Sequence, residues 1–263
     1  ARTAPVVIYQ MTWSVGGDAM VVKANIHTAK DLKGKTIAVQ AYGPHVDYLA
    51  KILTDAGLTI QDVSIKWVKD LTGTDNTPMV ALQEDTTIDA AMVIIPDALA
   101  LTSGGGVGTG SEDSVKGARI LLSTKTANRI IPDVYAVRAD YLATHRGDVQ
   151  KFVHGLMRAE EQLKTLVTEK QARAAEYQQM ISAAADILLD SPQAVSDAEG
   201  LYADCEYVGF SGNVKFFGDA QYPRNLDRLT QEIQTAFRTI GLLSQPVPLV
   251  QAKWDYAGLQ SGL

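Results

Sequence analysis

The sequence is almost free of cysteine. Cys205 is the only one in 263 residues. A single thiol excludes an internal disulfide and a zinc site built from several cysteines. Scarcity of thiols is compatible with an exported bacterial protein, but many cytosolic proteins are equally poor in cysteine.

Long apolar runs and an excess of positive charge are also missing. The longest apolar stretch, Ala90 to Ile95, ends at Pro96 and is far shorter than the roughly 18 residues of a membrane helix. The net charge of -6 disfavours a nucleic-acid partner, since phosphate binding usually needs a basic face. The first residues lack the charged and apolar regions of a signal peptide, which leaves both a cytoplasmic protein and a mature exported one open.

Short β-branched segments alternate with segments of helical periodicity in the first half of the chain. Strands are predicted over 6–9, 19–23, 36–40, 63–68, 90–95, 120–123 and 133–137. Helices are predicted from Pro44 to Gly57, over 77–83 and from Asp97. This alternation favours parallel βαβ units whose sheet has helices on both faces.

The second half of the chain has a different character. From Arg146 onward, apolar residues follow one face of a long helix that includes Val149, Val153 and Met157. Further helices are predicted through Leu189, over 192–202 and over 226–240. We therefore expect an α/β protein of two unequal lobes, with parallel-rich sheets and a helix-rich C-terminal portion.

Two glycine-containing motifs are similar to nucleotide sites but do not meet their requirements. Gly34-Lys35-Thr36 precedes a strand, whereas the lysine of a P-loop opens a helix, and Ala29 stands where that loop needs its first glycine. The glycine-rich segment 103–110 has no G-x-G-x-x-G register, and we interpret it as a mobile loop.

His45 is a candidate for a site. No second histidine lies at helical spacing from it, so a metal centre is not expected. A nucleophile elbow of the G-x-S-x-G type is also absent from the sequence. His45 is then either a polar residue at a helix start or a ligand contact.

Polar residues follow several predicted strands at the points where helices or turns begin. The junction from Gln40 through Tyr42 and Gly43 to His45 combines the free amides of a helix start with a flat aromatic face. Polar residues with comparable positions are Ser14, Gly17, Asp18, Thr72, Thr74 and Asp97. Ligands of α/β sheets bind at the carboxyl ends of the strands, so these residues are candidate ligand contacts.

The segments Asp31–Val39, Tyr42–His45 and Asp55–Leu58 resemble the start of the second lobe in periplasmic solute-binding proteins of ABC transporters. The branch that they resemble serves nitrate, sulfonate, taurine and thiamine-precursor transporters. Asp89–Ala91 before Pro96, and Tyr135–Arg138, continue the similarity. The tail resembles a subgroup that is often joined to a cell-wall-binding domain.

The resemblance implies two α/β lobes of the type 2 periplasmic-binding fold, joined by a two-stranded hinge, with a solute held between them. Residues 1–30 and 134–263 would form the first lobe, and residues 31–133 the second. Trp13, Ser14, Gly17 and Asp18 would lie on the lip of the first lobe, and Gln40, Tyr42, Gly43 and His45 on the second. Asp97 and Asp133 would lie near the cleft or hinge. The elements that open the first lobe in the family are missing before Val6.

The function expected from these observations is non-enzymatic binding of a small polar solute by a monomeric protein of the periplasm or cell envelope. The solute would be an anion, or else a zwitterion or amine, and a membrane permease or a cell-wall-binding domain would be the partner. Related thiamine-pyrimidine synthases use a pyridoxal cofactor and a cysteine-rich loop; with only Cys205, no cofactor is expected here. The alternatives are an enzyme that uses His45 with Asp18 or Asp97, and an envelope scaffold that binds no solute.

Overall fold

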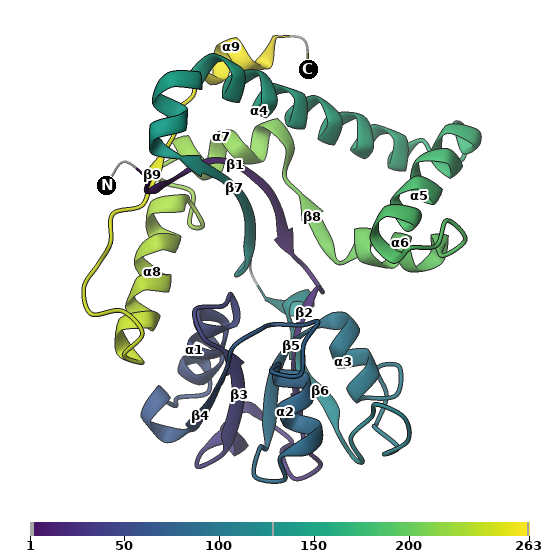
Figure 1. The fold of residues 1–263 in the computed structure, drawn as a ribbon, viewed down its shortest axis with the longest axis vertical. Coiled ribbons are helices and arrows are strands. Elements are labelled where there is room, and N and C mark those ends of the chain that lie inside the picture. The colour runs from purple at the N-terminus through teal and green to yellow at the C-terminus, as the bar shows by residue number, and fades with distance from the viewer. Residues whose placement is uncertain (1–2, 128, 262) are drawn as a thin grey trace. The chain divides into compact units, whose positions relative to one another are not determined.

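A computed structural model describes residues 3–127, 129–261 and 263. Its contacts divide the chain into two compact units (Figure 1). Unit 1 comprises Ala1–Trp13, Pro132–Leu229 and Pro248–Leu263, and unit 2 comprises Ser14–Ile131 and Thr230–Val247. The two units are described separately below.

Unit 2 is built around a mixed sheet of five strands in the order β4-β3-β5-β2-β6. The strands are β2 (Asp18–Val22), β3 (Thr36–Gln40), β4 (Ser64–Val68), β5 (Ala90–Ile94) and β6 (Arg119–Ser123). β3 pairs in parallel with β4 and β5, as the alternation of strands and helices predicted. β2 pairs antiparallel with β5 and β6, so the parallel part of the sheet is limited to β4, β3 and β5.

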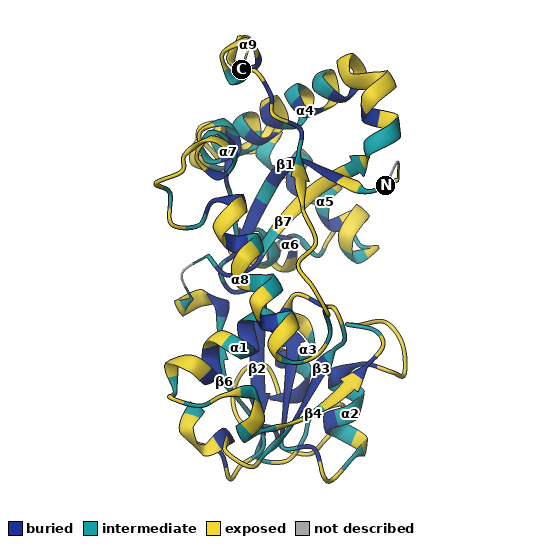
Figure 2. Ribbon diagram, turned by 90° about the vertical axis from the view of Figure 1, so that its left-hand side faces the viewer, coloured by how far each residue is buried: buried dark blue, intermediate teal, exposed yellow. Residues whose placement is uncertain are grey.

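Helices cover both faces of this sheet. They are α1 (His45–Asp55), α2 (Pro78–Glu84) and α3 (Ile95–Leu101), and the short 3-10 helices are η1 (Ala29–Leu32), η2 (Ile60–Asp62) and η3 (Thr124–Thr126). Ile37 and Val39 pack in one core cluster with the apolar face of α1. Ala38, between them, packs in the other cluster with residues of α2 and α3. This opposite orientation of successive residues is the two-residue period of a strand, and β3 and β5 are buried on both faces (Figure 2).

Unit 1 contains a smaller sheet centred on β1 (Pro5–Ser14). β7 (Pro132–Arg138) pairs antiparallel with β1, and β9 (Val250–Gln251) pairs in parallel with it. β8 (Cys205–Tyr207) is the other neighbour of β1. This sheet therefore contains both antiparallel and parallel pairing, because β7 returns along β1 in the opposite direction while β9 runs in the same direction.

The rest of unit 1 is helical, as the periodicity of the C-terminal half predicted. The helices are α4 (Ala139–Thr168), α5 (Ala174–Leu189), α6 (Val195–Ala203), α7 (Gly209–Gly218) and α9 (Tyr256–Gln260). α8 (Leu226–Thr239) begins in unit 1 and continues in unit 2. α4 starts earlier than expected and has non-helical backbone angles at His145, which explains why helical periodicity is clear only after that residue.

The contact units differ from the expected division of the chain at three places, of which the shortest is residues 132–133, which lie in unit 1. Residues 14–30 lie in unit 2 rather than with residues 1–13, because β2 is hydrogen-bonded between β5 and β6. Residues 230–247 also lie in unit 2, where Phe237 and Ile240 pack against the core cluster of α1. Among the described residues, no helix is both long and apolar enough to cross a membrane.

Candidate functional site at the sheet edge of unit 2

The ends of several strands lie along one edge of the unit 2 sheet. Asp18, the first residue of β2, is paired with Ile94 at the end of β5, and Ala19 is paired with Ser123 at the end of β6. Gln40 and Val68 end the neighbouring parallel strands together. The carboxyl ends of four strands and the start of β2 therefore lie along one edge, where α/β proteins commonly bind ligands.

His45 and Asp18 form the buried centre of this edge. His45 is the first residue of α1 and is fully buried, and its Nε2 lies 2.7 Å from Oδ1 of Asp18. A carboxylate accepts hydrogen bonds, so Nε2 carries the proton in this contact. The other ring nitrogen, Nδ1, is buried and has no hydrogen-bond partner within the described residues. In the neutral ring, this nitrogen is an unsatisfied acceptor.

Asp97 adds a second carboxyl group near His45. It lies in the first turn of α3 and is half-buried. Burial raises the pKa of Asp97 from its ordinary value, and the imidazole of His45 opposes this effect. Burial also raises the pKa of the Tyr48 phenol, with a smaller contribution from the charge of Asp18. His45 therefore lies within electrostatic range of Asp97 while it is hydrogen-bonded to Asp18.

Thr124 fixes the segment that leads into β2. Its Oγ1 lies 2.7 Å from Oγ of Ser14 and accepts hydrogen bonds from the amides of Gly16 and Asp18. Ser14, Thr124 and Asp18 are all buried, so this arrangement is a fixed part of the unit. The sequence interpretation missed Thr124, although it directly follows the predicted strand 120–123, and the same rule that selected Gln40 would have found it.

The junction between β3 and α1 brings an aromatic ring to the surface. Tyr42 has a backbone φ of 61° and is 68% exposed, and its ring contacts Phe237 edge-on with 6.3 Å between the centroids. A left-handed backbone is unusual for a tyrosine and is often found at functional sites. A Cβ atom on Gly43 would lie 2.4 Å from Oε1 of Gln40, so a larger residue there would displace the Gln40 side chain.

The remaining predicted contacts are placed differently. Thr72 and Thr74 are exposed in the loop after β4, and the hydroxyl of Thr74 donates to Asp70. Trp13 and Asp133 belong to unit 1. Asp133 is exposed and accepts a hydrogen bond from Thr12 over 2.6 Å.

Trp13 differs most from its expected position on an exposed lip. It is only 1% exposed and packs edge-on against Phe216, with 5.8 Å between the ring centroids. This packing makes it a core residue of unit 1. Ser14, Gly17 and Asp18, which were expected on the same lip, lie in unit 2.

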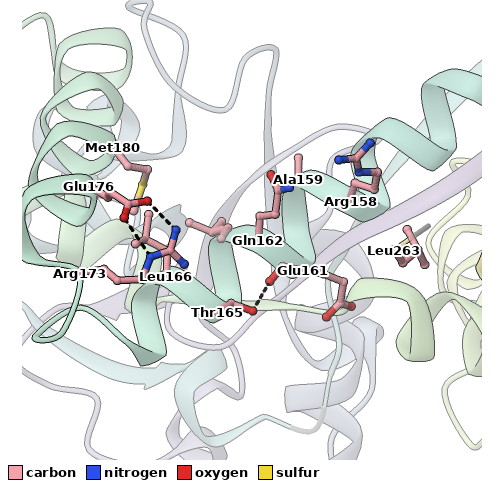
Figure 3. Close-up of a pocket in the computed structure, with 11 residues that line it drawn as sticks. Arg158, Ala159, Glu161, Gln162, Thr165, Leu166, Arg173, Glu176, Met180 and Leu263 are labelled. Carbon is pink, nitrogen blue, oxygen red and sulfur yellow. Dashed lines mark hydrogen bonds and ion pairs between the residues drawn. The ribbon is translucent and has the colours of Figure 1, made fainter.

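Unit 1 has a cavity of its own, a groove of about 840 Å³ between α4 and α5 (Figure 3). Leu163, Leu166 and Met180 contribute apolar surface to it. Arg173 points toward Glu176 and is ion-paired with it and with Glu169. Arg158 also lines this groove. No group of three or more potential metal ligands is found among the described residues.

Comparison with protein families identifies the chain. The model of the NMT1/THI5-like family matches residues 11–165, which is more than half of the sequence. The chain belongs to this family. The resemblance drawn from residues 31–58 is therefore confirmed. No curated protein matches the sequence.

Solved structures confirm the type 2 periplasmic-binding fold of this family member. The alkanesulfonate-binding protein SsuA from Xanthomonas axonopodis pv. citri, bound to MOPS, is 17% identical with a TM-score of 0.60, and the match covers 94% of this chain and 74% of that one. The periplasmic aliphatic sulphonate-binding protein SsuA from Escherichia coli is 17% identical with a TM-score of 0.55, and the match covers 95% and 71%.

The same fold also occurs in an enzyme. The desulfurization enzyme DSZB is 18% identical with a TM-score of 0.51, and the match covers 98% of this chain and 80% of that one. The fold therefore does not by itself distinguish a binding protein from a catalyst. That distinction depends on the chemistry of the residues at the sheet edge.

Proposed function

We propose that this protein binds a small polar solute without chemical conversion and delivers it to an ABC-type importer of the cell envelope. The observation that carries the proposal is the group formed by Asp18, His45 and Thr124. Residues from three separate elements are held by hydrogen bonds at the edge where ligands bind in such sheets. The family and the names of the similar structures support the same class of function.

The start of α1 is the second support for solute binding. Pro44 precedes His45 and has no side chain that could cap the helix. The amides of a helix start carry partial positive charge and bind polar groups without any catalytic step. The exposed ring of Tyr42 beside them supplies an apolar surface for the carbon skeleton of a solute.

The enzyme alternative rests on the His45–Asp18 pair and on the fold of DSZB. A histidine held by a carboxylate is a common general base. However, Nε2 of His45 is used in the contact with Asp18, and the whole ring is buried. The hydroxyls of Ser14 and Thr124 at this edge are bonded to each other. In the described part of the chain, no hydroxyl or thiol is hydrogen-bonded to either ring nitrogen of His45.

A thermal-shift screen combined with mass spectrometry tests the proposal. The screen uses nitrate, taurine, an alkanesulfonate and an aminopyrimidine, which represent the solutes of the transporter branch that the sequence resembles. We expect at least one of them to raise the melting temperature and to be recovered unchanged after long incubation. Recovery of a converted product would establish the enzyme alternative, and the absence of any shift would favour a scaffold.

A Tyr42→Ala variant shows whether binding uses the sheet edge. Since Tyr42 is 68% exposed, the variant should keep the melting temperature of the unliganded protein and lose most of the ligand-induced shift. Tyr141→Ala is the matched control, because Tyr141 is also an exposed tyrosine but lies on α4 of unit 1. Equal losses in both variants would contradict the assignment of the site.

A further inference from the structure

We infer that the solute carries a cationic nitrogen with several N–H donors, an ammonium or amidinium group, and that Asp97 and Nδ1 of His45 accept hydrogen bonds from it. This inference rests on the proposed function and names the chemical class of the ligand.

The first argument comes from the unsatisfied nitrogen of His45. Nδ1 is buried without a partner in the described part of the chain, while Nε2 is bonded to Asp18. Leaving a buried acceptor unpaired costs about 1–3 kcal/mol, and most buried polar groups are therefore paired. A ligand that brings a donor to Nδ1 recovers this cost. With the ring neutral, a ligand that brings only acceptors does not.

The second argument comes from Asp97, which is independent of the first. Its carboxyl group is half-buried and, among the described residues, has neither a hydrogen bond nor an ion pair with another side chain. The ionisable group that affects Asp97 is His45. His45 is hydrogen-bonded to Asp18, and the charge of Asp18 in turn affects Tyr48. None of them is a lysine or arginine. A carboxylate in this position is best stabilised by a cationic donor.

Two positively charged side chains follow strands that end at the same edge, but both are exposed to solvent. Lys69 follows the end of β4, and Lys125 follows Thr124 at the end of β6. Both side chains are exposed, so their charges are screened by water and salt. The ionisable side chains that are buried or half-buried at this edge include Asp18, His45, Tyr48 and Asp97. Their chemistry therefore determines which polar group of the solute is bound most strongly.

This class of ligand differs from a simple alkanesulfonate. A sulfonate group presents three oxygen acceptors and a negative charge, so it would meet Asp97 and the lone pair of Nδ1 without forming a hydrogen bond to either. A solute that also has an ammonium group, as a zwitterion does, can satisfy both acceptors. The inference thus separates an amine or zwitterion from an anion, which the sequence left open.

Three probes with the same three-carbon skeleton test the inference by isothermal titration calorimetry. They are propane-1-sulfonate (an anion), 3-aminopropane-1-sulfonate (a zwitterion) and 1,3-diaminopropane (a cation). We expect the better of the two amines to bind at least about tenfold more tightly than propane-1-sulfonate, the effect of one charge-assisted hydrogen bond. Tighter binding of propane-1-sulfonate would overturn the inference while leaving the proposed function intact.

The variant Asp97→Asn identifies the residue responsible, because asparagine keeps the size of the side chain and removes its charge. It should lose about tenfold or more of the affinity for the amine and change the affinity for propane-1-sulfonate little or increase it. Asp75→Asn is the control, because Asp75 is an exposed aspartate of the loop after β4. An unchanged amine affinity in Asp97→Asn would overturn the inference. Failure of all three probes to bind the wild-type protein would overturn the inference, and the wider thermal-shift screen would then decide the proposed function separately.

Discussion

Nε2 of His45 lies 2.7 Å from Oδ1 of Asp18, and both residues are buried at the edge of the unit 2 sheet. The two residues come from different elements, the start of α1 and the start of β2. Their contact therefore ties the first helix of the unit to the antiparallel strand β2. It also sets the orientation of the imidazole, and with it the position of the unsatisfied Nδ1.

The first prediction concerns this contact. His45→Ala leaves the carboxylate of Asp18 buried without its partner, and we expect the free energy of unfolding to fall by about 3 kcal/mol, measured by urea denaturation. Asp55→Asn is the matched control, because it removes an exposed ion pair with Lys51 on the same helix and should cost less than about 1 kcal/mol. Similar losses of unfolding free energy in both variants would mean that the buried His45–Asp18 contact stabilises the fold no more than an exposed ion pair does.

The second prediction concerns the pH dependence of stability at Asp97. Its pKa is raised in the folded protein by burial, so the unfolded chain releases this proton at a lower pH. The contribution of Asp97 to stability is then fully present below its ordinary pKa and is lost as the pH rises through the folded pKa. Asp97→Asn cannot ionise. The melting temperature of Asp97→Asn minus that of wild type should therefore increase from about pH 4 to about pH 7. If this difference in melting temperature stayed constant across the range, burial would not affect the pKa of Asp97.

The third prediction uses two glycines of the segment 103–113. A Cβ atom on Gly108 would lie 2.1 Å from the carbonyl oxygen of Val115 and 2.8 Å from that of Leu101. Gly108→Ala should therefore destabilise unit 2 by about 2 kcal/mol or more. At Gly106 the nearest atom would be 3.9 Å away, so Gly106→Ala should be nearly neutral. Urea denaturation of both variants checks the difference, and equal stabilities would contradict the close packing at Gly108.

The fourth prediction separates two aromatic residues that the sequence placed in one group. Trp13 is 1% exposed and packs on Phe216, whereas Tyr42 is 68% exposed. Trp13→Ala should lower the free energy of unfolding by about 3–5 kcal/mol. Tyr42→Ala should change it by less than about 0.5 kcal/mol and act mainly on ligand binding. A stable Trp13→Ala variant would show that Trp13 is not part of the core.

The sequence predicted the elements of unit 2 well because their signals are local. The apolar spacing of Val46, Leu49 and Ile52 identifies α1, and β-branched runs identify the strands. The antiparallel direction of β2 was not predictable in this way, since strand direction depends on pairing with β5 and β6, which lie far away in the chain. The same pairing explains why Ser14, Gly17 and Asp18 lie in unit 2.

The candidate site was predictable in part, for a comparable reason. Polar residues after strands could be selected one at a time, and His45 and Asp18 were both selected. Their mutual hydrogen bond is a long-range contact, so it could not be read from either segment alone. Trp13 was assigned to a lip from the family resemblance, and an aromatic residue next to a turn suits both a ligand contact and a core. Only the packing against Phe216, more than 200 residues later in the chain, decides between them.

The most direct test of the account is the location of the ligand, measured by backbone amide NMR during titration with the tightest-binding probe. We predict that the largest chemical-shift changes occur at the amides of Gly17, Asp18, Gly43 and His45, at the edge of the unit 2 sheet. Changes confined to the groove between α4 and α5, at residues such as Leu166 and Arg173, would contradict the account.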